Sequence, residues 1–160
     1  MRYSIREANA EDHKALNELF AAGDRFHREA LPHLFQESAG LARPEEFLSG
    51  IMTGEDSAMF VAEYERQVVA LINVLVKETP AIPILKPRRY AVVEDLYVMK
   101  SVLRQGIGRV LVEAAGRWAS CKAATEMELN VWEFNQGAMA FYDHPGFSTW
   151  SRKMAVSLSR

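Results

Sequence analysis

A glycine-tipped turn between an apolar segment and an amphipathic helix is the feature that most constrains this chain. Residues 90–98 have the β-branched and aromatic character of a strand, and residues 107–118 carry apolar side chains at helical spacing. Gly106 and Gly108 lie between them, where glycine lets the main chain approach a ligand closely. The free amides at a helix N-terminus carry partial positive charge and favour a phosphate. The segment therefore predicts a strand–turn–helix unit that can bind an anion.

A second segment further along the chain strengthens this signal, which is weak on its own. Residues 130–142 read N-V-W-E-F-N-Q-G-A-M-A-F-Y, and Pro145, Gly146 and Phe147 follow shortly after. In this order the two segments resemble motifs A and B of the GNAT superfamily of N-acetyltransferases. Residues 94–99 also resemble the polyamine-type members of that superfamily. A tight turn that binds nothing is the alternative, and the downstream motif makes it the less favoured one.

Alternation and helical spacing outline a chain of mixed strands and helices. Strands are predicted at residues 3–7, 58–64, 68–76, 90–98 and 127–131, with one or two more at 147–150 and 153–157. Helices are predicted after Asp12 as N-cap, from Pro44, over 107–118, and from Asn135 to the stop at Pro145 and Gly146. A polar turn at 65–67 implies antiparallel pairing, and the helix at 107–118 implies a parallel crossover.

The resemblance sharpens this outline into a fold class. It implies the α/β (α+β) GNAT fold, with a mixed, mostly antiparallel central sheet of six or seven strands and helices on both faces. In that fold the fourth and fifth strands are splayed apart. At 160 residues, with 49% apolar and 25% charged residues, the chain is predicted to form a single domain over residues 1–160.

Charge and cysteine content exclude several classes of protein. A net charge of −2 gives no electrostatic case for binding nucleic acid or an anionic membrane. The single cysteine excludes an intramolecular disulfide, and no apolar run is long enough to span a membrane. The N-terminus lacks the apolar segment of a secretory signal. No His, Cys or acidic residues have metal-ligand spacing, so no metal is predicted. We expect a cytoplasmic protein.

The GNAT resemblance implies acetyl-CoA as the cosubstrate. Its pyrophosphate would lie on the backbone amides of the turn, and its pantetheine arm would pair with the main chain of Leu96 and Val98. Leu103 occupies the position where the family has Arg or Gln, which removes one side-chain contact. The residues predicted to bind the cofactor are Leu96, Tyr97, Val98, Arg104, Gln105, Gly106, Ile107, Gly108, Arg109, Asn135, Ala138, Phe141 and Tyr142.

Two of the residues that match the family's motifs are predicted to be catalytic. Tyr142 matches the residue that protonates the departing thiolate, and Glu94 matches a strand-four glutamate that serves as general base, often through water. Asp95 is expected to point to the opposite face, unless a β-bulge exchanges the two acids. The alternatives are a core aromatic for Tyr142, a structural acid for Glu94, and a pure N-cap for Asn135.

Other reactive side chains are given structural roles. Cys121 follows the helix at 107–118 with no histidine near it in sequence, so we expect a structural thiol and direct transfer without an acyl-enzyme. His27 and His33 lie in the segment that usually covers the acceptor cleft in the family. Contact with the acceptor and simple packing both remain open for these two histidines.

The sequence therefore predicts an acetyl-CoA-dependent N-acetyltransferase that acts on a primary amine of a small molecule, such as a polyamine or amino-acid-like compound. A protein or peptide acceptor remains an alternative, as does a catalytically silent CoA-binding sensor or partner subunit. The loops give opposite hints, because residues 24–43 contain acids that suit a cation and residues 79–89 contain bases that suit an acid. Family resemblance also leaves a homodimer open.

Overall fold

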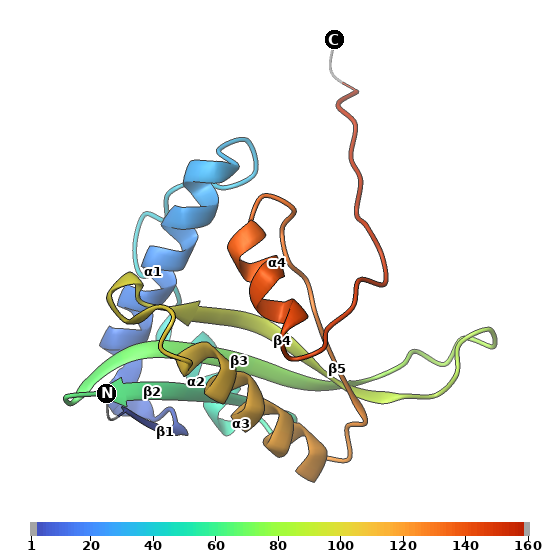
Figure 1. Cartoon of the computed structure of the whole chain (residues 1–160), viewed down its shortest axis with the longest axis horizontal. Coiled ribbons are helices and arrows are strands. Elements are labelled where there is room, and N and C mark those ends of the chain that lie inside the picture. The colour runs from blue at the N-terminus through green and yellow to red at the C-terminus, as the bar shows by residue number, and fades with distance from the viewer. Residues whose placement is uncertain (1–2, 159–160) are drawn as a thin grey trace. The chain divides into compact units, whose positions relative to one another are not determined.

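A computed structural model describes residues 3–158 of the chain (Figure 1). The chain divides into two compact units, Met1–Asn130 and Val131–Arg160. Within residues 3–158, the first unit contains the β-sheet and three α-helices, and the second contains one further helix.

The first unit is organised around a five-stranded sheet in the order β1-β2-β3-β4-β5. Its strands are β1 (Tyr3–Glu7), β2 (Ser57–Tyr64), β3 (Gln67–Glu78), β4 (Arg89–Val98) and β5 (Glu126–Leu129). Neighbours pair antiparallel from β1 to β4, and β5 pairs parallel to β4. The parallel step follows from the crossover helix α3 (Ile107–Cys121), as expected for a strand–helix–strand unit. A mixed, mostly antiparallel sheet is thereby confirmed.

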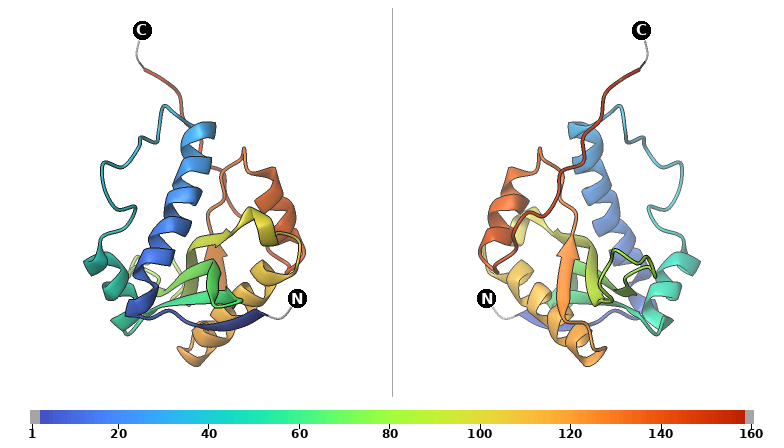
Figure 2. Two further views of the ribbon diagram at one scale, coloured as in Figure 1. Left: turned by 90° about the vertical axis from the view of Figure 1, so that its left-hand side faces the viewer. Right: turned by 90° about the vertical axis from the view of Figure 1, so that its right-hand side faces the viewer.

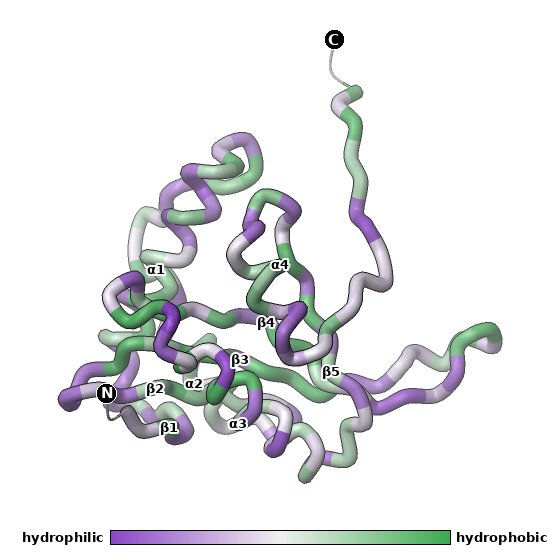
Figure 3. The backbone as a smooth tube through the Cα atoms, in the orientation of Figure 1, coloured by the Kyte–Doolittle hydropathy of each residue, from purple (hydrophilic) through white to green (hydrophobic). Residues whose placement is uncertain are grey.

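Helices cover both faces of this sheet, as Figure 2 shows. Helices α1 (His13–Ala30) and α2 (Glu45–Thr53) pack on one face, where Leu16, Leu48 and Leu71 are fully buried in one cluster. The other face is covered by α3, whose apolar stripe is buried. Strand β3 lies between the layers as a nearly continuous apolar run (Figure 3). Burial on both faces explains why its sequence does not alternate.

The start of α1 differs from the prediction in its chemistry. Asp12 does precede the helix, but its side chain does not cap it. Its carboxylate instead accepts from Arg6 at 2.7 Å and from the Asn9 amide at 2.9 Å. Arg6 lowers the pKa of Asp12 and holds it charged. A buried carboxylate bonds the strongest donor within reach, and here that is the β1 arginine.

Two local features of the first unit bear on the site. Helix α1 runs through Gly23 without a break, and a Cβ added there would lie 3.3 Å from the Tyr97 ring on β4. Glycine therefore permits the close approach of α1 to β4. The β2–β3 hairpin turns at Glu65 and Arg66, both with positive φ, as its right-handed twist requires.

The second unit shows that the prediction of six or seven strands was wrong. Residues 147–158 form no strand, and β5 is the edge of the sheet in the described part of the chain. The apolar side chains there alternate as they would in a strand, yet Trp150, Met154 and Val156 are 69–89% exposed. Alternation records which side chains would share a face, but a strand also needs a partner for its backbone groups.

None of the helices within residues 3–158 is long and apolar enough to cross a membrane.

Candidate active site

Strand β4 has two neighbours along one half of its length and one along the other. It pairs with β3 from Arg89 to Val98, but with β5 only from Tyr90 to Val93. Among the described residues, no strand pairs with residues 94–98 on the side of β5. The main-chain groups of that edge are therefore available to an extended ligand, because an unpaired strand edge is a template for further pairing. The pairing with β4 ends at Val93 because β5 ends at Leu129, and the expected splaying of these strands stays a prediction.

A β-bulge lies where the second neighbour of β4 ends. The register pairs Asn73 with Asp95 and Val74 with Val93, which makes Glu94 the extra residue. A bulge interrupts strict alternation, so two successive side chains can lie on one side of the sheet. The side-chain contacts show that Glu94 and Asp95 do lie on one side of the sheet. Glu94 accepts from Lys77 at 3.1 Å, Asp95 accepts from Asn73 at 3.0 Å, and both partners lie on the same face of β3.

The prediction that Asp95 points away from Glu94 was therefore wrong. Both carboxylates lie on the face that carries α1, and they differ in their surroundings. Glu94 is exposed and ion-paired with Lys77. Asp95 is partly buried, and this burial raises its pKa, as do the nearby charges of Glu94 and Asp24. Asn73 and Arg43 oppose the rise in the pKa.

Asn73 is a site residue that the sequence analysis missed. It is 3% exposed in the middle of β3, where every neighbour from Val68 to Val76 is apolar. Its Nδ2 donates to Asp95, while its Oδ1 is buried and has no hydrogen-bond partner in the described residues. The signal was present in the sequence, because a single amide inside a buried strand needs a polar partner.

The strand–turn–helix unit continues from the open half of β4. A short 3₁₀ turn at Lys100–Val102 leads to Gly106, which caps α3 with φ 80° in the left-handed region. Glycine adopts that conformation without strain. Within the described residues no side chain caps this helix, so its first amides are left for solvent or for a ligand. An uncapped N-terminus that follows an open strand edge is suited to an anion attached to an extended chain.

The side chains around this turn are mostly exposed. Arg104 is exposed and has a positive φ of 62°. Arg109 is exposed too, and its Nε bonds the carboxylate of Glu113 at 3.0 Å. Leu103 is 50% exposed and offers no polar group. The structure thus leaves the first main-chain amides of α3 without a side-chain cap, and their binding of an anion stays a prediction.

In the second unit, α4 (Gln136–Asp143) carries the residues of the downstream motif. Asn135 is its N-cap, with Oδ1 accepting from the Ala138 amide at 3.1 Å. The N-cap interpretation of Asn135 is therefore confirmed. Its Nδ2 makes no hydrogen bond to any described residue, so this group can still donate to a ligand.

Tyr142 lies near the end of α4 in an aromatic cluster. Its ring meets Phe141 at 5.0 Å and Phe147 at 5.4 Å between centroids, both edge-on. Burial raises the pKa of Tyr142 to about 12, because an apolar environment disfavours the phenolate. The hydroxyl therefore keeps its proton at neutral pH and remains able to donate it.

The acetyltransferase (GNAT) family model matches residues 16–147. The chain belongs to this family. A Bacillus subtilis protein named "Uncharacterized N-acetyltransferase YhfO" is 24% identical over 144 residues, which are 90% of this chain and 89% of that protein. Family membership and this relative support an acyltransferase enzyme.

Solved structures share this fold. A mutant of the BH1408 protein from Bacillus halodurans superposes with a TM-score of 0.92 at 25% identity, covering 98% of this chain and 99% of that one. The aminoglycoside N-acetyltransferase AAC(6')-Iy, in complex with CoA, gives 0.72 at 16% identity, covering 98% and 94%. The second likeness concerns the fold alone.

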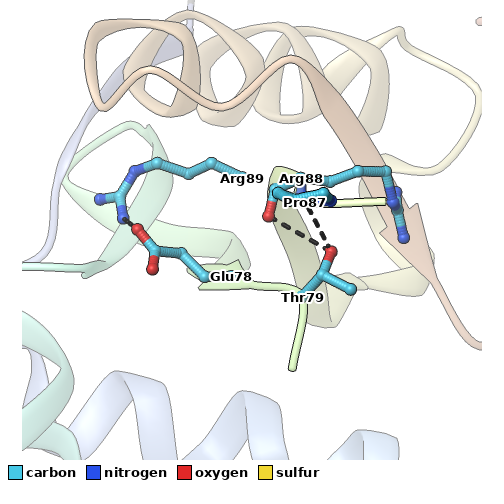
Figure 4. A pocket seen from close by; sticks show the side chains of 5 residues that line it. All are labelled: Glu78, Thr79, Pro87, Arg88 and Arg89. Carbon is cyan, nitrogen blue, oxygen red and sulfur yellow. Dashed lines mark hydrogen bonds and ion pairs between the residues drawn. The ribbon is translucent and has the colours of Figure 1, made fainter. Parts of the chain in front are cut away.

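A cavity of about 320 Å³ lies away from this edge, at the base of the loop between β3 and β4 (Figure 4). Its wall includes Arg88 and Arg89, two of the three bases that hinted at an acidic acceptor; the third is Lys86. Arg88 pairs with Glu126 and Glu128, and Arg89 pairs with two further carboxylates. Protein acids already neutralise these two arginines, which leaves Lys86 as the remaining base of that loop.

The remaining reactive residues of this GNAT protein lie elsewhere. Cys121 is exposed at the last position of α3, roughly 20 Å along the helix from Gly106. His27 bonds the Gly23 carbonyl through Nδ1 at 2.8 Å and packs against the rings of Phe26 and Phe35. Packing therefore accounts for His27. Residues 3–158 contain no group of three His, Cys, Asp or Glu residues placed to hold a metal.

Proposed function

We propose that this protein transfers the acetyl group of acetyl-CoA directly to a primary amine of a small molecule. The observation that carries the proposal is the open edge of β4 at residues 94–98, followed by the uncapped N-terminus of α3. The edge suits the amide-bearing pantetheine arm, and the helix terminus suits the pyrophosphate. Family membership supports CoA as the carrier of the acyl group.

The chemistry needs a base, because an alkylammonium has a pKa near ~10 and is not nucleophilic at neutral pH. In the proposal, exposed Glu94 relays the proton from the acceptor to solvent. The free amine then attacks the thioester carbonyl, and a main-chain N–H of the open edge stabilises the oxyanion. The tetrahedral intermediate then collapses with cleavage of the C–S bond, and Tyr142, which holds its proton well beyond neutral pH, donates to the departing CoA sulfur. The former amine nitrogen loses its second proton, which restores the Tyr142 hydroxyl directly or through water.

Direct transfer is preferred to an acyl-enzyme. The sole cysteine is at the opposite end of α3 from the proposed phosphate site. Such a thiol would have to carry the acetyl group across the length of the helix. Mass spectrometry after incubation with acetyl-CoA alone should therefore find no stoichiometric acetylation of Cys121.

The experiment is a thiol-release assay with acetyl-CoA and a panel of polyamines, amino acids and lysine peptides. We expect acetyl-CoA-dependent release with at least one small amine and a matching mass increase of 42 Da on the acceptor, the mass of an added acetyl group less one hydrogen. Thiol release with lysine peptides alone would show that the acceptor is a protein and not a small molecule. Binding of acetyl-CoA with no turnover across the panel would favour the silent sensor, which the apolar Leu103 also suggests.

A further inference from the structure

The described chain ends in an extended segment whose apolar side chains are not buried. Residues 148–158, here called the tail, form no helix or strand, and in Figure 1 they run away from α4. Met154, Val156 and Leu158 are 89%, 82% and 90% exposed. They alternate with Ala155 and Ser157, so an extended chain places all three on one side, the apolar face of the tail. Exposed apolar surface that gathers on one face marks a contact surface.

The main chain of the tail is unpaired too. Residues 151–158 make no backbone–backbone hydrogen bond to any described residue. Strand β5 pairs with β4 alone, so its outer edge has no strand partner within residues 3–158. Proteins often protect such an edge with lysine or proline, and residues 126–131 contain neither. An unprotected edge is a template for a further strand, and the tail has the alternation of one.

The two sides of β5 show how an added strand would face. Met127 and Leu129 share one side, and a Cβ added to Gly116 of α3 would lie 3.6 Å from the Met127 side chain. That side is therefore the one toward α3. Both residues are only partly buried, as expected next to an uncovered edge. A strand beside β5 extends this apolar layer when the apolar face of the tail points toward α3.

Charge favours the same pairing. The tail contains Arg152 and Lys153 and no acidic residue. Residues 126–133 contain three glutamates and no base. Arg88 pairs with two of these glutamates, which leaves three negative charges against one positive charge at this edge. A basic strand is attracted to such an edge, whereas a second copy of β5 is repelled by it.

We propose that two copies of this chain form a dimer by exchanging their tails, each tail pairing as a strand with the outer edge of β5 in the other copy. The occupant is a second copy because the tail and the edge are both unpaired within one copy. The exchange is two-fold symmetric, so it closes after two copies. This interface goes beyond the proposed acetyl transfer and does not depend on it.

Sedimentation velocity of the full-length protein over a range of concentrations tests for the dimer. We expect association to twice the 18.1 kDa of one chain. Val156→Asn should weaken the dimer about 100-fold, because burying one valine contributes roughly tenfold and the exchange buries two. Ser157→Asn, the adjacent position on the opposite face, should dimerise as the wild type does. Both positions are exposed in one copy, so neither variant should unfold.

Spin-label NMR distinguishes exchange from a tail that folds back onto its own copy. A nitroxide would be attached to Ser157→Cys in a Cys121→Ser background, and this protein would be mixed with nitrogen-15-labelled wild type until subunits exchange. We expect the nitroxide to broaden the amide resonances of residues 126–129 in the labelled copy, which carries no nitroxide itself. Chemical reduction of the nitroxide should restore these resonances.

Three outcomes would overturn the inference. The first is a monomer at every concentration, and the second is wild-type dimerisation in Val156→Asn. The third is broadening at residues 126–129 only when the nitroxide and the nitrogen-15 label are on the same chain, which would show that the tail pairs within its own copy. The thiol-release assay tests the proposed function separately, since a monomer that transfers acetyl groups would contradict only the tail exchange.

Discussion

The two halves of β4 are one continuous strand with opposite roles. Residues 90–93 pair on both edges, and Ala91 and Val93 are buried. Residues 94–98 pair on one edge, begin with a bulge, and carry two carboxylates. The first half satisfies its own backbone and packs the core, while the second leaves main-chain groups and charges for a ligand. A strand can therefore hold a fold together at one end and form a binding site at the other.

The largest effect is expected on the free energy of unfolding, from a substitution within residues 90–93. Val93→Asp would place an unpaired charge at a position that is 5% exposed, and should lower the free energy of unfolding by about 4 kcal/mol. Glu94→Gln, one residue further, should change it by less than about 0.5 kcal/mol, because the Lys77 ion pair is exposed. Urea denaturation of both variants would measure this contrast. Equal losses would show that the two halves do not differ.

The next effect concerns the helix that the open half leads to. Gly106→Asp should weaken acetyl-CoA binding by about 100-fold or more, because it adds bulk and negative charge at an anion site. Aspartate tolerates the left-handed conformation, so the fold should survive. Gly40→Asp is a matched control, since a side chain there meets open space. If calorimetry shows wild-type affinity in folded Gly106→Asp, the pyrophosphate does not bind at this turn.

The next effect concerns the proton donor proposed for the CoA sulfur. Tyr142→Phe keeps the ring contacts and removes the hydroxyl, so kcat should fall about 100-fold with acetyl-CoA affinity unchanged. Because the pKa of Tyr142 is about 12, its ionisation should not lower the wild-type rate below about pH 10. Full activity in the variant would mean that water protonates the thiolate.

The smallest expected effect is a gain in stability, from a substitution of Asp95. The folded-state pKa of Asp95 is raised, so its stabilising contribution is greatest at low pH and is lost as the pH rises through that pKa. At pH 7 its charge therefore opposes folding. Asp95→Asn should stabilise the protein by about 1 kcal/mol at pH 7 and by less at pH 4. Urea curves at the two pH values would show it, and destabilisation at pH 7 would contradict this account.

The strand, the turn and the helix around the open half of β4 could be predicted from sequence, but the bulge in that strand could not. Gly106 and the helical spacing after it are local signals, so the turn and α3 followed directly. The bulge at Glu94 depends on the register in which β3 and β4 pair, and a long loop separates these strands. A local sequence pattern does not record that register. The Asn73–Asp95 contact, 22 residues apart in sequence, has the same origin. The prediction of strands at residues 147–150 and 153–157 was wrong because alternation does not show whether a strand has a pairing partner.

Hydrogen exchange along β4, with and without saturating acetyl-CoA, tests the central claim most directly. Residues 90–93 already lie between two paired strands, so their amides should exchange slowly in both states. Acetyl-CoA should newly protect amides within residues 94–98 and 106–109. Binding that leaves both of these segments unprotected would show that the open edge of β4 is not the cofactor site.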